Sequence, residues 1–374
     1  MAHSGVFRPR LPSLTGIRFP LMLAVFIGHI ALIVPFADPG TAQWYHHYLS
    51  GVGKVGLSFF FLLGGFILTW IHREKDTPLL FWRRRLTKIV PLHWLTFAVA
   101  MLVFAGSVTT FEAGAMSVLL VQAWSPDPQI FGAANAPAWS LTCVVFFYLL
   151  FPALHRAVSR IQARHLWWYV GAVLAMIFAV PAVVRAVVPA QAGMAPNAPA
   201  GSTDAFWIIH IFPMTRLLEF FLGVLVARIV MAGRWAGPGP LPFAILLAVL
   251  YFVGLETPAE YRLVAMTIVP LTLLLGSLAA ADLRGGRSIV ANRLMEWLGD
   301  ISFAFLLIHW PVMNFFFQQF GEERLYSVPM AIGVASLDLA VSLALAWLLT
   351  VAVERPLVKL LSQPRRSREA ALAR

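Results

Sequence analysis

Two ionisable side chains, Arg18 and His29, interrupt the first long apolar stretch of the chain. They are eleven residues apart, which is about three turns of an α-helix, so both lie on one helix face, roughly 16 Å apart along its axis. A histidine can act as a general base or a nucleophile, and an arginine can bind phosphates or stabilise an oxyanion. Because both are costly in a membrane unless they face a bundle interior or a wet cavity, they predict a functional site.

The composition is that of a membrane protein with many spans. Of the 374 residues, 60% are hydrophobic and only 12% are charged, and the mean hydropathy is +0.78. A water-soluble fold cannot bury that much apolar surface. The single cysteine, Cys143, excludes an internal disulfide and a metal site built from cysteines. We therefore expect an integral membrane protein, and no metal site.

Apolar stretches long enough to cross a bilayer recur along the chain and predict about ten transmembrane helices. A shorter apolar segment at 114–124 stays unassigned. The fold class is thus an all-α bundle, with any chemistry inside it because neither end has room for a soluble catalytic domain. The ten windows are 17–36, 51–71, 89–106, 138–155, 166–188, 206–229, 240–256, 260–281, 297–319 and 329–353.

The net charge of +11 is distributed unevenly across the predicted membrane. With a cytoplasmic N-terminus, 22 of the 28 Lys and Arg residues fall on the cytoplasmic side and four on the far side. This is the positive-inside pattern, and an even number of spans places both termini in the cytoplasm. No nucleic-acid partner is needed to explain the charge. The four far-side residues are Lys54, Arg185, Arg262 and Arg324.

The chain divides into one transmembrane domain at 1–360 and a basic cytoplasmic tail at 361–374. The far-side loops are short except for 107–137 and 189–205, which are rich in Ala, Pro and Gly. Loops of that length can cover or shape a site, so we expect them near the far end of any cavity.

Seven blocks of sequence, in order along the chain, carry a family resemblance. They are LPSLTGIRFPLMLAVFIGH (11–29), GVGKVGLSFFFLLGGFILT (51–69), FWRRRLTKIVPLHW (81–94), WSLTCVVFFYLLFP (139–152), FPMTRLLEFFLGVLVAR (212–228), LGDISFAFLLIHWP (298–311) and VERPL (353–357). Together they resemble the membrane acyltransferase-3 family from about residue 11 to 358. No single block is highly specific, but seven in the right order on the predicted topology are.

The resemblance implies that His29 takes a proton from a sugar hydroxyl as the acyl carbon is attacked, or carries the acyl group briefly itself. Arg18 then either stabilises the oxyanion as a catalytic residue or joins Arg85 and Lys88 in holding the donor. These two lie on one helix face and match the family's basic pair, which suits the phosphates of coenzyme A. Acetyl-CoA, or another acyl-CoA, is expected as a co-substrate, with no permanently bound cofactor.

Five further residues are candidates for contact with substrate, and each has a structural alternative. Ser140 can simply cap a helix, and Arg216 and Glu219 can neutralise each other three residues apart within one helix. A histidine before Trp-Pro can serve as a packing or gate residue. The five are Trp139, Ser140, Arg216, Glu219 and His309.

Two positions depart from the family pattern. Position 64 is Gly where the family usually has Ser, and Val144 stands where the family commonly carries a Glu five residues after Trp139. A valine cannot orient a histidine or hold a sugar as a carboxylate does. Either another carboxylate, such as Glu219, takes that part, or the protein is slow or inactive.

The resemblance as a whole implies a multi-pass O-acyltransferase of the bacterial inner membrane. Its expected partners are acyl-CoA, the lipid bilayer and a carbohydrate acceptor, namely a lipid-linked or exported polysaccharide, with xanthan-type acetylation as an example. Two other hypotheses stay open. The chain can be a transporter of acyl groups or lipid-linked sugars, or an inactive member that serves as a sensor or scaffold.

Overall fold

The computed structural model describes residues 9–33, 36–73, 76–189, 202–286, 288–320 and 325–361. Within these ranges the chain is helical, and its β-structure is one isolated bridge between Phe36 and Tyr326. The fold class predicted from the sequence is therefore confirmed. All of the predicted tail beyond Leu361 lies outside the described residues, as does most of the 189–205 loop.

The helices follow one another closely along the chain. In order they are α1 (Pro12–Gly16), α2 (Arg18–Ile33), α3 (Pro39–Leu49), α4 (Val52–Trp70), α5 (Pro78–Ala100), η1 (Met101–Ala105), α6 (Phe111–Val118), η2 (Gln122–Trp124), α7 (Pro128–Phe131), η3 (Ala136–Ala138), α8 (Trp139–Ser159), η4 (Ala163–His165), α9 (Leu166–Val187), α10 (Thr203–Phe206), η5 (Trp207–Ile211), α11 (Pro213–Met231), α12 (Pro240–Leu255), α13 (Ala259–Arg262), α14 (Ala265–Leu283), α15 (Arg293–Phe320), α16 (Val328–Leu349), η6 (Thr350–Glu354) and α17 (Arg355–Leu361).

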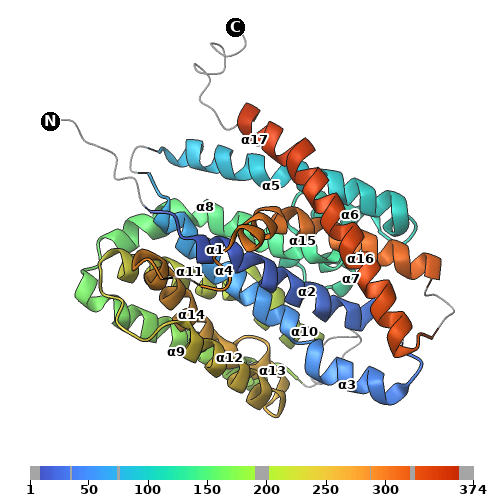
Figure 1. Ribbon diagram of the computed structural model, residues 1–374, viewed down its shortest axis with the longest axis horizontal. Coiled ribbons are helices and arrows are strands. Elements are labelled where there is room, and N and C mark those ends of the chain that lie inside the picture. Colours follow the sequence, from blue (N-terminus) through green and yellow to red (C-terminus); the bar gives the residue numbers. More distant parts are fainter. Residues whose placement is uncertain are drawn as a thin grey trace, which may run out of the picture.

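Each of the ten predicted windows contains a helix, and eight helical stretches of the described chain are long and apolar enough to cross a membrane. The two other windows hold α11, which carries three charged residues, and α12, which has only 16 residues. The unassigned segment at 114–124 overlaps α6, a helix of eight residues. In the bundle, α1, α2, α4 and α15 lie centrally, with α5 and α17 along one edge and α9 and α12 along another (Figure 1).

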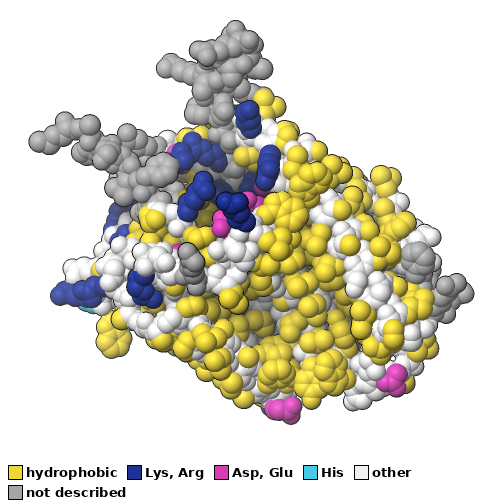
Figure 2. All heavy atoms as spheres, viewed as in Figure 1, with side chains coloured by type: hydrophobic (Ala, Val, Ile, Leu, Met, Phe, Trp, Pro, Cys, Tyr) yellow, Lys and Arg dark blue, Asp and Glu magenta, His cyan; other side chains and the backbone are white. Residues whose placement is uncertain are grey.

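Contacts between helix ends bring several of the basic segments to one end of the bundle. The Ser13 hydroxyl donates to Asp282 at the end of α14, at 2.5 Å. At the start of α5, Arg83 donates to the carbonyl of Leu361, at 2.9 Å. Figure 2 shows Lys and Arg gathered near the ends of α17 and α5, above a broad hydrophobic surface. This distribution matches the positive-inside pattern predicted from the sequence.

Glycines allow the central helices to cross at close range. A Cβ on Gly65 of α4 would overlap the carbonyl oxygen of Phe220 in α11, and one on Gly223 would overlap that of Leu62. Near the other end of α4, a Cβ on Gly28 of α2 would lie only 3.1 Å from the backbone nitrogen of Gly53. These crossings hold α2, α4 and α11 together around the space between them.

Candidate active site

Helix α2 carries both residues that the sequence singled out. It begins at Arg18, directly after the short helix α1, and continues without a break past His29. The two side chains therefore project from one rigid element, roughly 16 Å apart along its axis. Each lines a different cavity, and His29 is half-buried.

A hydrogen-bonded relay fixes the orientation of His29. Nδ1 of the fully buried His309 lies 3.0 Å from the carbonyl oxygen of Phe305, which can only accept, so this nitrogen carries a hydrogen. In neutral His309 the lone pair is then on Nε2, which lies 2.9 Å from Nδ1 of His29. Nδ1 of His29 must donate, which leaves its Nε2 as an unprotonated base.

The two imidazole rings lie nearly in one plane, as the hydrogen bond between their nitrogens requires. They are parallel within 3°, with centroids 5.2 Å apart, and Trp310 meets His29 edge-on at 5.1 Å. The sequence placed His309 among residues that contact substrate or gate the site. In the structure it lies behind His29, and the lining of neither cavity includes it.

We call the cavity beside His29 the outer cavity; it has a volume of about 200 Å³. Four aromatic rings line it, and polar groups from several helices converge on it, as in small-molecule sites generally. Segment 107–137 contributes Phe131 and its neighbours, as expected of a loop that shapes a site. The lining residues are Val25, Gly28, His29, Ser50, Gly53, Lys54, Leu57, Phe131, Gly132, Ala136, Pro137, Trp139, Ser140, Phe206, His210, Ile211, Leu306 and Trp310.

Two polar residues of the outer cavity were missed by reasoning from the sequence. Lys54 was counted only as a far-side charge, yet it lies in the first turn of α4 and lines the cavity. His210 lies in η5, where its ring packs against Trp139 at 5.2 Å. A histidine inside a predicted span was the available signal for His210. No pattern in the sequence indicated that Lys54 lines a cavity.

A second cavity, of about 190 Å³, lies toward the basic end, and we call it the inner cavity. Its lining brings together the three cations predicted to hold the donor, Arg18, Arg85 and Lys88. The neighbouring Arg83 and Arg84 have partners elsewhere. Arg83 bonds the Leu361 carbonyl, and Arg84 pairs with Asp76 at 2.6 Å. The structure thus separates cations that line the cavity from those that tie helix ends together.

The inner-cavity cations are only partly neutralised by the protein. Lys88 forms an ion pair with the buried Glu354 at 3.1 Å, which gives that carboxylate a structural partner. Arg85 lies over the ring of Phe81, with 5.8 Å from its guanidinium carbon to the ring centroid, and its Nε is buried with no hydrogen-bond partner among the described residues. Positive charge is therefore available for an anionic ligand.

Three residues, Leu57, Ser140 and Leu306, line both cavities and form the wall between them. The Ser140 hydroxyl donates to the carbonyl of Pro137 at 2.8 Å, so it occupies the junction without serving as a simple N-cap. Ser140 therefore lines both cavities, and its contact with substrate stays a prediction. Trp139 lines only the outer cavity.

Arg216 and Glu219 lie outside the lining of both cavities. Each is only 1% exposed, and they pair at 3.0 Å across one turn of α11. Arg216 also donates to Ser58 at 3.2 Å and lies over the ring of Phe61, which does line the inner cavity. Their contacts join α11 to α4, which is the arrangement of a neutralising structural pair.

Both departures from the family pattern, Gly64 and Val144, line the inner cavity. The missing carboxylate would therefore face the cations and not His29. Glu219 does not replace it there, because that side chain is held by Arg216 behind the cavity wall.

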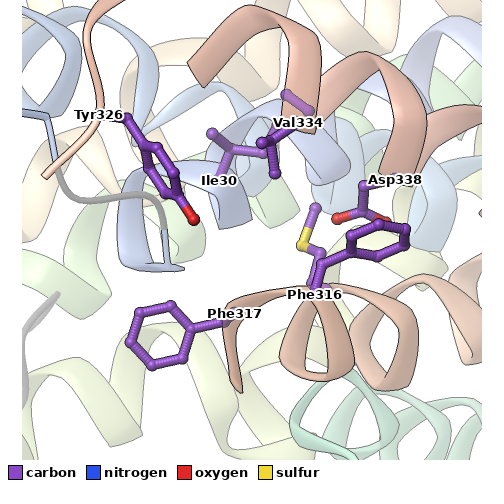
Figure 3. A pocket seen from close by; sticks show the side chains of 8 residues that line it. Ile30, Phe316, Phe317, Tyr326, Val334 and Asp338 are labelled. Carbon is purple, nitrogen blue, oxygen red and sulfur yellow. The ribbon is translucent and has the colours of Figure 1, made fainter. Parts of the chain in front are cut away.

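A third cavity, of only about 10 Å³, lies between α2, α15 and α16, and has room for about one water molecule. Figure 3 shows Ile30, Tyr326 and Asp338 around it. Asp338 accepts a hydrogen bond from Ser342 at 3.1 Å. No residue of the two larger cavities lines this one, and we assign it no part in their chemistry.

Comparison with known proteins agrees with the resemblance seen in the motifs. A family model described as an acyltransferase domain matches residues 11–351. The acyltransferase MdmB of Streptomyces mycarofaciens is 39% identical over 367 residues, which cover 95% of this chain and 94% of the relative. The exopolysaccharide production protein ExoZ of Rhizobium meliloti (strain 1021) is 27% identical over 274 residues, covering 71% of this chain and 77% of the relative.

The match spans nearly all of the helical bundle, including both cavities, and the apolar helices make the chain a multi-pass membrane protein. The chain therefore belongs to membrane acyltransferase family 3, and it is an enzyme that transfers acyl groups other than aminoacyl groups.

Proposed function

We propose that this enzyme moves an acyl group, acetyl in the simplest case, from acyl-CoA in the inner cavity to a carbohydrate hydroxyl in the outer cavity. The observation that carries the proposal is the shared wall. One cavity offers cations, the other offers a histidine base, and Ser140 lies between them. A thioester that reaches the wall from one side meets a hydroxyl that reaches it from the other.

The donor is assigned to the inner cavity by charge. Arg18, Arg85 and Lys88 line it, and clustered cations bind the phosphates of coenzyme A. The length of α2 also favours a phosphate role for Arg18. Roughly 16 Å separates its backbone from that of His29, whereas an oxyanion contact must be within about 3 Å of the carbon under attack. Arg18 thus anchors the donor while the pantetheine arm extends toward His29.

His29 provides the proton chemistry. Nε2 takes the proton of the acceptor hydroxyl while the hydroxyl oxygen bonds to the thioester carbon. The resulting intermediate then breaks the bond from carbon to sulfur, and the proton held by His29 passes to the departing thiolate. The products are a sugar ester and coenzyme A. His309 holds His29 in the tautomer this step requires, because Nδ1 of His29 has an acceptor at 2.9 Å.

The same lone pair on His29 also permits a two-step route. Nε2 then attacks the thioester itself, and the acceptor later displaces the acyl group from the imidazole. Ser140 is a weaker candidate for this part, because its hydroxyl is engaged with the Pro137 carbonyl and no base is paired with it. Rapid quenching in the absence of acceptor tests this route by detecting an acylated peptide that contains His29.

A carbohydrate acceptor is supported by two observations. Trp139, Trp310 and Phe131 line the outer cavity, and such rings can pack against the apolar faces of sugars. One relative is named an exopolysaccharide production protein. We accordingly propose a lipid-linked or exported polysaccharide as the acceptor, and the bacterial inner membrane as the location, with the basic end in the cytoplasm.

Purified enzyme in proteoliposomes tests the function directly. Labelled acetyl-CoA is supplied at the basic end and a soluble glycoside at the other, and ester formation is followed by mass spectrometry. We expect ester and free coenzyme A from the wild type, and neither from the His29→Ala variant. His165→Ala is the matched control, since His165 is an exposed histidine of η4 that lines neither cavity.

Two results would overturn the proposal. If the His29→Ala variant transfers the acyl group at the wild-type rate, His29 is not the base of the reaction. Label that crosses the membrane without forming ester identifies a transporter instead.

A further inference from the structure

The outer cavity is lined by basic groups from three separate elements. His29 comes from α2, Lys54 from α4 and His210 from η5, and its lining contains no Asp or Glu. Because His29 is neutral in the tautomer that donates to His309, the positive charge of this cavity comes from Lys54, and a neutral sugar does not require that charge.

The described part of the protein does not neutralise Lys54. No carboxylate of that part lies within 4.0 Å of its ammonium group, and the group that acts electrostatically on it is another cation, Arg262. His210 is only 6% exposed, and its Nδ1 has no hydrogen-bond partner among the described residues. Its charged neighbours, Arg216 and Lys54, are basic too.

An ammonium group withdrawn from water without a counter-ion is unfavourable, and such groups in membranes face a cavity or pathway that compensates them. The inner cavity shows the contrast, because Lys88 there pairs with Glu354 at 3.1 Å. Lys54 has no such partner among the residues that the structure describes, so a ligand can supply the missing negative charge.

We propose that the outer cavity takes an acceptor that carries an anionic group, a phosphate or a carboxylate, bound beside Lys54 and His210. The inference rests on the proposed function and specifies its acceptor class. The close crossing of Gly28 and Gly53 makes the backbones of His29 and Lys54 neighbours. The anionic group therefore lies next to the hydroxyl that His29 deprotonates, on the same sugar or across one glycosidic or phosphate linkage.

A binding experiment tests the site without any reaction. Full-length protein in phosphatidylcholine nanodiscs is titrated with three soluble probes of one sugar: a methyl glycoside, the 1-phosphate and the uronic acid. We expect the wild type to bind an anionic probe about tenfold more tightly than the glycoside. Lys54→Met is expected to lose this preference and Lys54→Arg to keep it, while Lys359→Met, at an exposed lysine of α17, behaves as wild type.

A transfer experiment with the same probes separates this inference from the proposed function. We expect Lys54→Met to raise KM about tenfold for anionic acceptors and to raise KM for the neutral acceptor far less. An equal loss of kcat/KM with neutral and anionic acceptors would overturn the inference, because Lys54 would then act on the reacting atoms. If Lys54→Met prefers anionic over neutral acceptors as strongly as the wild type does, the inference is overturned as well.

Two further outcomes are distinguishable. Lys54-dependent binding without ester from any acceptor supports the anionic site and contradicts the proposed transfer. If phosphatidylglycerol in the nanodiscs stabilises the wild type but not Lys54→Met, and the soluble anions have no effect, a lipid headgroup occupies the site and the acceptor assignment fails.

Discussion

Nδ1 of His29 lies 2.9 Å from Nε2 of His309, which joins the first long helix of the bundle to a helix 280 residues later in the chain. The carbonyl of Phe305 determines the direction of this hydrogen bond, because it accepts from the far nitrogen of His309. The pair therefore resembles the base and orienting group of other acyl-transfer sites, with an imidazole in place of a carboxylate. No charge needs to be buried to hold the base.

Replacing His309 is expected to slow the reaction without weakening donor binding. His309→Phe keeps an aromatic ring against Phe26 and Phe305 but removes the acceptor of the His29 hydrogen bond. In the Ser-His-Asp triad, loss of the group that orients the histidine lowers kcat by about 10⁴. We therefore expect kcat to fall at least tenfold while KM for acyl-CoA stays unchanged. Steady-state kinetics on the purified variant measure both quantities.

His309→Gln serves as the conservative companion, since its amide oxygen can accept from His29. It should retain more activity than His309→Phe at equal thermal stability. A rise in KM as large as the loss of kcat, or equal losses in both variants, would contradict a positioning role.

Removing the inner-cavity cations is expected to weaken the binding of acyl-CoA without affecting the acceptor. Arg85→Gln and Lys88→Gln should each raise KM for acyl-CoA about tenfold, since a charge-assisted hydrogen bond contributes about 1.5 kcal/mol or more. Dephospho-coenzyme A thioesters lack one phosphate, so their KM should rise less in the variants than the KM of the full donor does. The measurement is KM for each donor at saturating acceptor.

Arg84→Gln is the matched control for these variants, because Arg84 lies in the same basic run but pairs with Asp76 at 2.6 Å. It should leave KM unchanged. An equal effect of Arg84→Gln and Arg85→Gln would mean that the whole run acts through general surface charge.

Much of the fold could be predicted because one-dimensional signals control it. Each predicted span needed only a long apolar run, and the orientation, which stays a prediction, rests only on the sign of the flanking charges. The shared face of Arg18 and His29 followed from helix periodicity, and Arg85 and Lys88 from their spacing and the family motif. These relations act within one element or along one membrane axis.

The contacts between distant helices could not be predicted in this way. His309 was assigned to the substrate or a gate because its bond to His29 depends on how α15 crosses α2. Lys54 was read as a loop charge, since only the close approach of Gly28 and Gly53 turns it toward His29. Side-chain partners across a bundle depend on packing, and a single sequence carries no periodic signal for that.

The orientation of the bundle can be measured with single introduced cysteines. Native Cys143 is fully buried, so a membrane-impermeant maleimide should not label the wild type. Arg160→Cys, after α8, should react only in permeabilised cells, and Gln43→Cys, in α3, in intact spheroplasts, because both parent residues are exposed at opposite ends. Labelling with the reverse pattern would contradict the cytoplasmic position of the basic end.

Restoring the family's carboxylate should not improve this enzyme. Val144 lines the inner cavity with Arg18 and Arg85, so Val144→Glu places a negative charge where the donor phosphates are proposed to bind. A repulsion of about 1 kcal/mol in a wet cavity would raise KM for acyl-CoA about fivefold. Val144→Gln, with similar size and no charge, should show less of this effect. A gain in kcat for Val144→Glu would instead identify a defective wild-type enzyme.

Two adjacent glycines of α4 should respond in opposite ways to the same substitution. A Cβ on Gly65 would overlap the backbone carbonyl of Phe220, whereas a Cβ on Gly64 would meet only the Phe220 ring, at 3.7 Å. Gly65→Ala must therefore push α4 away from α11, and overpacking of this kind costs about 1–3 kcal/mol or more. Gly64→Ala, and also the family-like Gly64→Ser, should be tolerated because 3.7 Å is an ordinary contact. Fluorescence-detected size-exclusion chromatography and thermal unfolding in detergent measure the difference. Equal Tm values for Gly64→Ala and Gly65→Ala would show that α4 and α11 do not cross at Gly65. The position of α4 in the wall between the inner and outer cavities would then be wrong as well.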